Sequence, residues 1–220
     1  MDFLGVPDLN PAHWVANLRQ KVMGHPFVYE KVRPFVIGGL DLSPAYANLA
    51  NSADDVVLDI GCGTGDALNY LGGFRAYYGF DTDAAAVAHA RGRFGQRPNV
   101  QYFEREATAA DFEQLRPTRV MMAGLLHHLD DATAVNLLRT CAGTPSVRRV
   151  ATQDVIYVDG AHFSNVLAFF DRGKFVRREP QYHALVQQAG LRVVKSEIVK
   201  SHPENGRALL FLMALDPIRV

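Results

Sequence analysis

Residues 56–65, Val-Val-Leu-Asp-Ile-Gly-Cys-Gly-Thr-Gly, decide the fold of this chain. The apolar residues around one acid predict a buried parallel strand, and the glycines at alternate positions predict a loop in which a ligand lies against bare backbone. A helical pattern follows, and a helix N-terminus offers unpaired N–H groups and a positive dipole end to such a ligand. The stretch therefore predicts a binding loop at the carboxyl edge of an open α/β sheet, where ligands usually bind.

Two acids in and beside this stretch distinguish between ligands. A dinucleotide fingerprint would place glycines at 61, 63 and 66, but Asp66 is a poor neighbour for a pyrophosphate. Asp59 lies two residues before Gly61, where a nicotinamide-binding strand is normally apolar, and a carboxylate there suits a ligand that carries an ammonium group. These two acids therefore make an NAD-dependent oxidoreductase a less favoured function.

The rest of the chain alternates between strand and helix patterns from Asp55 onward, which predicts an α/β fold with helices on both faces of a parallel sheet. The expected strands are 55–60, 75–80, 99–103, 119–124, 147–153, 191–198 and 207–214. The expected helices lie near 65–72, 83–93, 131–142, 161–171 and 180–189. Residues 1–54 are predicted to form a helical cap (Pro11–Met23, Pro26–Ile37 and Ser43–Ala50) that belongs to the same domain as residues 55–220.

The segment Val57–Gly65 strongly resembles motif I of the class I S-adenosylmethionine (SAM) dependent methyltransferases. The resemblance spans residues 54–215 and continues at the ends of the second, third and fourth predicted strands. It implies a Rossmann-like sheet of seven strands, mostly parallel with the last strand antiparallel. It also implies S-adenosyl-L-methionine as cofactor, S-adenosyl-L-homocysteine as product, and a methyltransferase of the small-molecule type.

Several residues at strand ends are expected to bind the cofactor. The resemblance assigns Asp81 to the two ribose hydroxyls, a role that a carboxylate at a strand terminus can fill, and a plain surface turn is the alternative. Asp83 is expected to cap the helix that follows it. Glu106-Ala107 matches an Asp-Ala pair that meets the adenine in similar enzymes, and an exposed acidic turn explains it equally well. The expected cofactor-binding set is Asp59, Gly61, Cys62, Gly63, Gly65, Asp81, Thr82, Glu106, Ala107, Gly124 and Leu125.

Composition and charge argue against several partners. The 220 residues carry 23 basic and 23 acidic side chains, so no net field concentrates nucleic acid. The Asn/Asp-Pro-Pro-aromatic motif of nucleic-acid amino-methyltransferases is also absent after the fourth predicted strand. No apolar run is long enough to cross a bilayer, and the N-terminus does not resemble a signal peptide. With only Cys62 and Cys141, the chain is expected to lie in a reduced, cytoplasmic setting.

Three histidines are candidates to accept a proton during methyl transfer. Histidine suits this role because its unperturbed pKa lies near neutrality. His128 is favoured from its place after the fourth strand, His127 and His162 are further candidates, and a structural histidine is an equally good interpretation of each. The adjacent His127 and His128 could in principle be metal ligands. No convincing set of further ligands accompanies them, so we expect no metal.

The segment after the fifth strand mixes polar and aromatic residues that suit a chamber for a methyl acceptor. The candidate lining residues are Tyr157, His162, Phe163, Phe169 and Phe170, with core packing preferred for Phe169 and Phe170. Residues 171–177 are predicted to be a solvated turn with a local salt bridge. An anion-binding use of Lys174 and Arg177 has no support in the sequence.

The predicted function is transfer of a methyl group from SAM to an O, N or C atom of a small, largely apolar metabolite. The alternative is a SAM-fold protein that binds the cofactor without methyl transfer, as a cyclase, scaffold or partner subunit. The acceptor, the methylated atom and the oligomeric state are not determined by the sequence.

Overall fold

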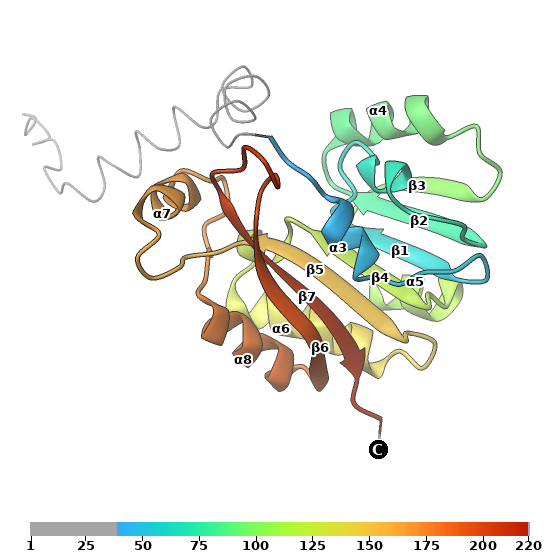
Figure 1. Cartoon of the computed structure of the whole chain (residues 1–220). Coiled ribbons are helices and arrows are strands. Elements are labelled where there is room, and N and C mark those ends of the chain that lie inside the picture. Colours follow the sequence, from blue (N-terminus) through green and yellow to red (C-terminus); the bar gives the residue numbers. More distant parts are fainter. Residues whose placement is uncertain (1–38, 220) are drawn as a thin grey trace, which may run out of the picture.

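The computed structural model describes residues 39–219, and its centre is one seven-stranded sheet (Figure 1). The strands follow the spatial order β3-β2-β1-β4-β5-β7-β6. Their bounds are β1 Val56–Ile60, β2 Ala76–Asp81, β3 Val100–Glu104, β4 Arg119–Ala123, β5 Arg149–Val155, β6 Leu191–Lys200 and β7 Leu209–Pro217. Strands β1 to β5 pair in parallel, and β7 runs antiparallel to both β5 and β6. The expected sheet, mostly parallel with an antiparallel last strand, is confirmed.

The strand order reverses at β1, which lies between β2 and β4. Asp59 of β1 pairs with Gly79 of β2 on one side and with Met121 of β4 on the other. At such a reversal the connections leave in opposite directions and open a crevice outside the carboxyl ends of the strands. The topology therefore brings the loops after β1, β2 and β4 to one edge of the sheet.

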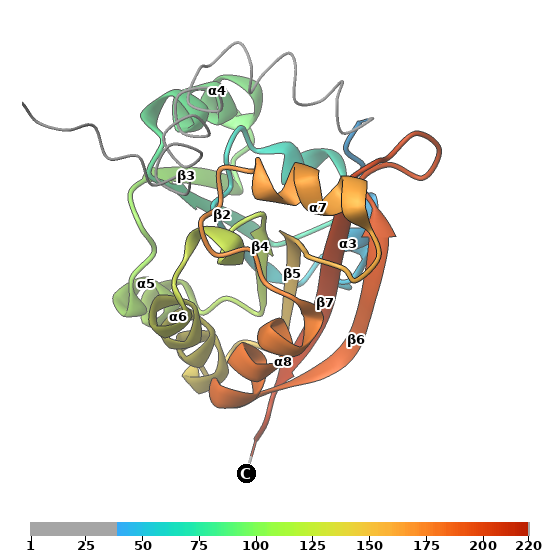
Figure 2. The same cartoon turned by 90° about the vertical axis from the view of Figure 1, so that its left-hand side faces the viewer.

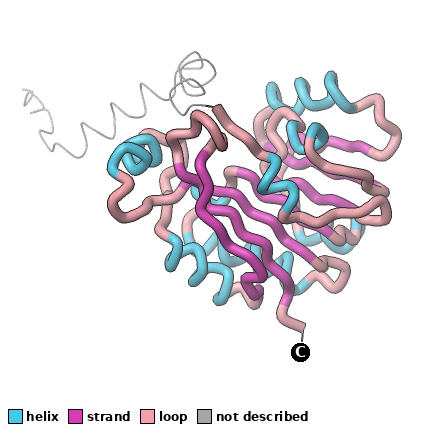
Figure 3. The backbone as a smooth tube through the Cα atoms, in the orientation of Figure 1, coloured by secondary structure: helices cyan, strands magenta, loops and turns pink. Residues whose placement is uncertain are grey.

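Helices cover both faces of the sheet, as Figures 1 and 3 show. One buried cluster includes side chains of α5 (Ala109–Leu115), α6 (Asp131–Gly143) and α8 (Glu179–Gln188). A second cluster includes side chains of α3 (Ser43–Ala47), α4 (Ala84–Phe94) and α7 (His162–Phe169). Because both faces are covered, β1 is buried at every position.

All seven predicted strands are present, with bounds shifted by at most three residues. The predicted helices near 83–93, 131–142, 161–171 and 180–189 correspond to α4, α6, α7 and α8. The sequence analysis missed α5. Thr108 and Asp111 form a reciprocal capping box at its start, a side-chain pattern that is visible in the sequence.

The helix expected near 65–72 is wrong in kind and length. The structure has only η2, a 3-10 helix over Asp66–Asn69, followed by an irregular segment that contains Gly72 and Gly73. Two consecutive glycines disfavour helix continuation because each costs conformational entropy. The argument from a helix dipole therefore does not hold for this loop, and its backbone N–H groups act without a helix behind them.

The expected cap over residues 1–54 is described only in its last part. Ala45 and Tyr46 of α3, with Leu49, are buried in the second cluster. The predicted helices Pro11–Met23 and Pro26–Ile37 lie outside the described residues. Within residues 39–219, no helix has the length and apolar composition needed to cross a bilayer.

Candidate active site

The loop after β1 is built from glycines in the left-handed conformation. Gly61, Gly63 and Gly65 have φ values of +76°, +52° and +78°. A Cβ at Gly65 would lie 2.5 Å from Oη of Tyr102, so glycine is required there by packing as well as by conformation. A Cβ at Gly63 would meet no atom within 4 Å. The space beside Gly63 is therefore open, as expected for a loop against which a ligand lies.

Asp81 links the end of β2 to this loop. Its Oδ2 accepts a hydrogen bond from the backbone N–H of Gly63 at 2.8 Å, and its Oδ1 accepts one from Asp83 at 2.9 Å. A carboxylate has about four acceptor positions, so each oxygen can accept a further bond from a ribose hydroxyl. The expected cap is confirmed, because Asp83 accepts from the backbone N–H groups of Ala85 and Ala86 at the start of α4.

Asp59 is a buried acid with one oxygen unbonded. The hydroxyl of Tyr77 donates to Oδ2 at 2.6 Å, and Oδ1 has no hydrogen-bond partner among the described residues. Burial raises the pKa of Asp59 to about 7, the Tyr77 bond opposes that rise, and the charge of Asp81 adds to it. A buried acceptor that lacks a donor is costly, and an ammonium group would satisfy it. The site therefore fits the aminoacyl end of SAM.

The ends of β1 and β4 meet at Gly61 and Leu125. Gly124 has a φ of +73° and donates its backbone N–H to the carbonyl of Gln153 at 2.6 Å. This turn directs the side chain of Leu125 over the glycine loop, where its Cδ1 lies 3.4 Å from the position of a Cβ at Gly61. The predicted residues of β1, β2 and β4 are thus brought together at one edge.

The remaining predicted cofactor residues differ in what they offer. The side chain of Cys62 is buried in the second cluster, 2.9 Å from the position of a Cβ at Gly79, so only its backbone faces the loop. Thr82 and Glu106 are exposed, and Ala107 packs partly buried against the first cluster. At the expected adenine end, the groups available to a ligand are therefore the loop backbone, the exposed Glu106 and the partly buried Ala107.

An aromatic platform near Glu106 was missed by the sequence analysis. The rings of Phe80 and Phe103 stack 4.6 Å apart, and the guanidinium of Arg105 lies over both, at 5.0 and 5.3 Å. Two nitrogens of Arg105 bind the carboxylate of Asp111, each at 2.7 Å. This bidentate pair fixes the conformation of the loop that leads to Glu106.

His127 occupies the centre of a buried ionic group. It is 3% exposed, and its Nδ1–H donates to Oδ1 of Asp154 at 2.8 Å, while Nε2 lies 3.0 Å from Oδ1 of Asp171. Burial lowers the pKa of His127, but the two carboxylates outweigh burial and raise it to about 9. At neutral pH both ring nitrogens carry protons and donate. This geometry favours a structural role for His127 over that of a proton acceptor.

The other two histidines are exposed. His128 is the last residue of η3 (Leu126–His128), and its ring centroid lies 4.3 Å from that of His127. His162 is the first residue of α7. Among residues 39–219, one group of three or more side chains could gather around a metal ion, namely His127, His128 and Asp171. The absence of a metal stays a prediction.

The solvated turn predicted for residues 171–177 is wrong for its two ends. Asp171 and Arg177 are each 4% exposed. Arg177 donates to the carbonyl oxygens of Leu126 and Leu129 at 2.8 and 2.6 Å and pairs with Asp131 at 2.7 Å. The carbonyl of Leu126 also accepts the backbone N–H of Leu129 at 3.2 Å, so Arg177 adds a second bond to it at the end of η3. Arg177 forms an ion pair, but with a residue 46 positions away rather than a local one, and anion binding by Arg177 is not supported.

The core packing preferred for Phe169 and Phe170 is also wrong, because α7 carries exposed apolar side chains. Phe163 is 56% exposed, Phe169 39% and Phe170 38%. Figure 2 shows α7 in front of the sheet, near β5 and β7, and the Ser164 hydroxyl accepts the backbone N–H of Leu209 at 2.9 Å. The buried residues of α7 are Ser164 and Ala168, so its phenylalanines are not part of the core.

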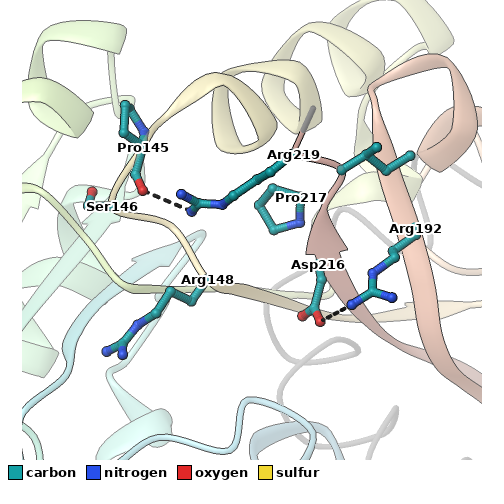
Figure 4. A pocket seen from close by; sticks show the side chains of 8 residues that line it. Pro145, Ser146, Arg148, Arg192, Asp216, Pro217 and Arg219 are labelled. Atoms are coloured by element: carbon teal, nitrogen blue, oxygen red, sulfur yellow. Dashed lines mark hydrogen bonds and ion pairs between the residues drawn. The ribbon is translucent and has the colours of Figure 1, made fainter.

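A large hollow lies away from all of these residues (Figure 4). Its volume is about 750 Å³, and its lining includes Arg148, Arg192 and Arg219. Arg148 pairs with Asp55, Arg192 with Asp216, and Arg219 donates to backbone carbonyls, so these cations are already satisfied. The residues predicted to bind a ligand lie at the carboxyl edge instead, and that edge is the candidate active site.

Comparison with known proteins bears on both the fold and the family. The structure resembles a chain from the complex of the Haloferax volcanii Trm112 methyltransferase activator, with a TM-score of 0.64, 15% identity, and coverage of 93% of this chain and 96% of that one. It also resembles Burkholderia thailandensis 1,6-didemethyltoxoflavin-N1-methyltransferase, with bound S-adenosylhomocysteine (TM-score 0.61, 20% identity, coverage 98% and 94%). Human N-acetylserotonin methyltransferase in complex with SAM gives a TM-score of 0.60 at 16% identity, with coverage of 94% and 66%. No curated protein sequence matches significantly.

The sheet topology and the glycine loop, together with these structural matches, define a Rossmann-like methyltransferase fold. Residues 57–144, which include this loop, match the family model described as "Methyltransferase domain". This match identifies residues 57–144, less than half of the chain, as a methyltransferase domain, and the solved structures, at 20% identity or less, share the fold of the chain.

Proposed function

We propose that this enzyme methylates an O, N or C atom of a small, largely apolar acceptor. The observation that carries the proposal is that a segment with an exposed aromatic side chain is attached to η3, the element that ends at His128. The backbone N–H of Phe175 donates to the carbonyl of His127 at 2.9 Å, and the ring of Phe175 is exposed. Phe163, Phe169 and Phe170 add apolar surface on α7.

For the cofactor, we propose that three strand ends share the binding. Asp59 binds the ammonium group, because its buried Oδ1 lacks a donor. The backbone of Gly61–Gly65 lies against the ligand, and Asp81 accepts from the ribose hydroxyls. Glu106 and Ala107 lie at the adenine, on the loop that Arg105 fixes.

Bound SAM supplies a methyl group that is already activated on a sulfonium. The residues of the chain then have two tasks. The aromatic side chains of this segment and of α7 orient the acceptor and exclude water, which lowers the entropic part of the barrier. His128 accepts the proton that the acceptor loses, since it is exposed whereas both nitrogens of His127 are engaged with carboxylates.

Incubation with methyl-labelled SAM and a panel of apolar phenols, amines and heterocycles tests this proposal. Label should pass to at least one acceptor, and His128→Ala should reduce that transfer. Cofactor binding without transfer to any acceptor would favour the second candidate, a SAM-fold protein that does not transfer methyl groups. Tight binding of NADH without binding of SAM would favour an oxidoreductase.

The possibility that the chain works as a partner subunit has one specific point in its favour. A structural neighbour was solved in the complex of the Trm112 methyltransferase activator. A chain of this fold can therefore act as one half of an assembly. Size-exclusion chromatography with light scattering, run beside the transfer assay, distinguishes a lone active enzyme from a subunit that requires a partner.

We further propose that residues 1–54 cap the active site in a reducing, cytoplasmic setting. The described chain begins beside the β6–β7 turn, where Asp41 donates its backbone N–H to the carbonyl of Ser201 at 2.6 Å. Ser164 of α7 binds the N-terminal residue of β7, so this entry point lies on the same side as α7. Both cysteines are buried free thiols. Removal of residues 1–38 should therefore weaken acceptor binding more than SAM binding.

A further inference from the structure

His127 lies where three segments of the chain cross. It belongs to η3, which follows β4, and its ring bridges Asp154 at the end of β5 and Asp171 after α7. Its backbone N–H also donates to Oδ1 of Asp154, at 3.0 Å. One side chain therefore joins η3 to the end of β5 and to the segment that follows α7.

Residues 171–177, here called the closing segment, fit closely around His127. A Cβ at Gly173 would lie 2.0 Å from Cδ2 of His127, so only glycine can pack there. The backbone N–H of Phe175 donates to the carbonyl of His127, and Arg177 donates to the carbonyl of Leu126. The closing segment is thus bound to η3 at three successive points.

The charges around His127 are only partly balanced, because one protonated ring faces two buried carboxylates. Asp154 faces it from β5, Asp171 from the closing segment and His128 from its own element. Burial raises the pKa of Asp154, while the bonds and charge of His127 and the charge of Arg177 oppose that rise. Removal of one partner from such a group leaves an uncompensated buried charge, which strongly destabilises the arrangement.

We propose that His127 is a positioning residue, which holds the closing segment against the end of β4 and so fixes the wall of the acceptor chamber beside His128. His127 does not touch the acceptor in this role. It acts through Phe175, whose exposed ring lies on the segment that it holds. The kinetic part of this inference rests on the proposed function, whereas its structural part does not.

Amide hydrogen exchange tests the structural part without any acceptor. His127→Gln and the milder Asp171→Asn should each speed exchange in residues 171–177 by about tenfold or more, with little change in β1 to β3. The exposed His89→Gln on α4 is the matched control and should leave exchange unchanged. If His127→Gln does not fold, Asp171→Asn carries the test. Unchanged exchange in the closing segment of a folded variant would overturn the proposal.

The pH dependence of exchange gives a second readout. The pKa of His127 is raised above its unfolded value of 6.5, so its contribution is fully present below that value and is lost as the pH rises through about 9. Corrected for intrinsic chemistry, exchange of residues 171–177 in the wild type should rise over that range. His127→Gln should show no such transition, and a transition retained in this variant would contradict the role.

Kinetics connect the closing segment to the acceptor. With an acceptor that the wild type methylates, Asp171→Asn should raise the KM for that acceptor by roughly tenfold, while the Kd for SAM changes by less than about twofold. Equal losses in both would show general damage and overturn the proposal. A metal role is the competing explanation, and calorimetric titration with Zn²⁺ tests it. Tight, stoichiometric Zn²⁺ binding that His127→Gln abolishes would replace positioning by ligation.

Discussion

Asp59 and Tyr77 share a 2.6 Å hydrogen bond inside the sheet, and this bond leaves one oxygen of Asp59 without a partner in the described part of the chain. The two residues lie on neighbouring strands, 18 positions apart, so the bond also fixes the orientation of the carboxylate relative to the glycine loop. The unbonded oxygen is a buried acceptor that no residue of 39–219 satisfies. That arrangement favours a ligand that brings its own donor.

SAM affinity should rise with pH up to about 7. The pKa of Asp59 is raised to about 7 by burial, and pairing with an ammonium group requires the ionised form, so binding releases a proton below that pH. Calorimetric titrations between about pH 5 and 7.5, below the usual pKa of an α-amino group, measure both the affinity and the released proton. Asp59→Asn, matched in size, should remove the dependence. A constant wild-type affinity over this range would count against ammonium binding at Asp59.

The same carboxyl should make the ligand-free protein less stable as the pH rises. The folded-state pKa of Asp59 is above its unfolded value of 3.8, so the native state binds more protons between the two values, and its stability falls from about pH 4 to about pH 7. Thermal melts of the wild type and Asp59→Asn should differ most near neutrality, with the variant more stable. A variant less stable than the wild type at pH 7 would show that the ionised carboxylate is already compensated.

Asp81→Ala should weaken SAM binding by about 1–3 kcal/mol, the cost of leaving buried donors unpaired. The substitution removes the acceptor for the ribose hydroxyls and also the bond that holds Gly63. Asp83→Ala is the control two residues later, since it removes only the cap of α4. It should cost about 1 kcal/mol of stability and leave SAM affinity unchanged. Equal affinity losses in the two variants would show that Asp81 acts only on loop structure.

The sequence predicts the sheet well because strand patterns are local. A buried parallel strand such as β1 is a continuous apolar run, and every strand appears within three residues of its expected bounds. The helix predicted near residues 65–72 is wrong for a related reason. The apolar pattern of this segment resembles a helix, but Gly72 and Gly73 end the helical segment after a single 3-10 turn. The apolar pattern predicted a longer helix because it did not take into account the two glycines that end the helical segment.

The charged groups of the candidate site were harder to predict, because their partners are distant in sequence. Arg177 lies 46 positions from Asp131, and Asp171 lies 44 positions from His127. In sequence, Asp-Arg-Gly-Lys-Phe-Val-Arg is typical of an exposed turn. Its two ends are buried against the carbonyls of Leu126 and Leu129 and against the ring of His127, and a single sequence displays none of these contacts. Asp81 and Asp59, by contrast, lie at strand ends and were predictable from position alone.

Gly65→Ala and Gly63→Ala should distinguish a glycine that packing requires from a glycine beside which the ligand lies. Both glycines have positive φ, and the left-handed conformation costs an alanine about 1–2 kcal/mol. A Cβ at Gly65 would also collide with the buried Tyr102, so the loss of unfolding free energy should reach about 3 kcal/mol. At Gly63 the Cβ enters open space, so stability falls less while SAM affinity falls more. Chemical denaturation and calorimetry measure the two quantities, and the reverse ranking would place the ligand elsewhere.

His128→Ala should lower kcat by about 10²–10⁴-fold, the usual contribution of a general base, with little change in the Kd for SAM. The exposed His162→Ala is the matched control, because it removes a second candidate from α7. Single-turnover assays with methyl-labelled SAM measure the chemical step apart from product release. Loss of turnover in His162→Ala alone would move the proton acceptor to α7. Loss of cofactor affinity equal to the loss of turnover in His128→Ala would show that this side chain positions SAM instead.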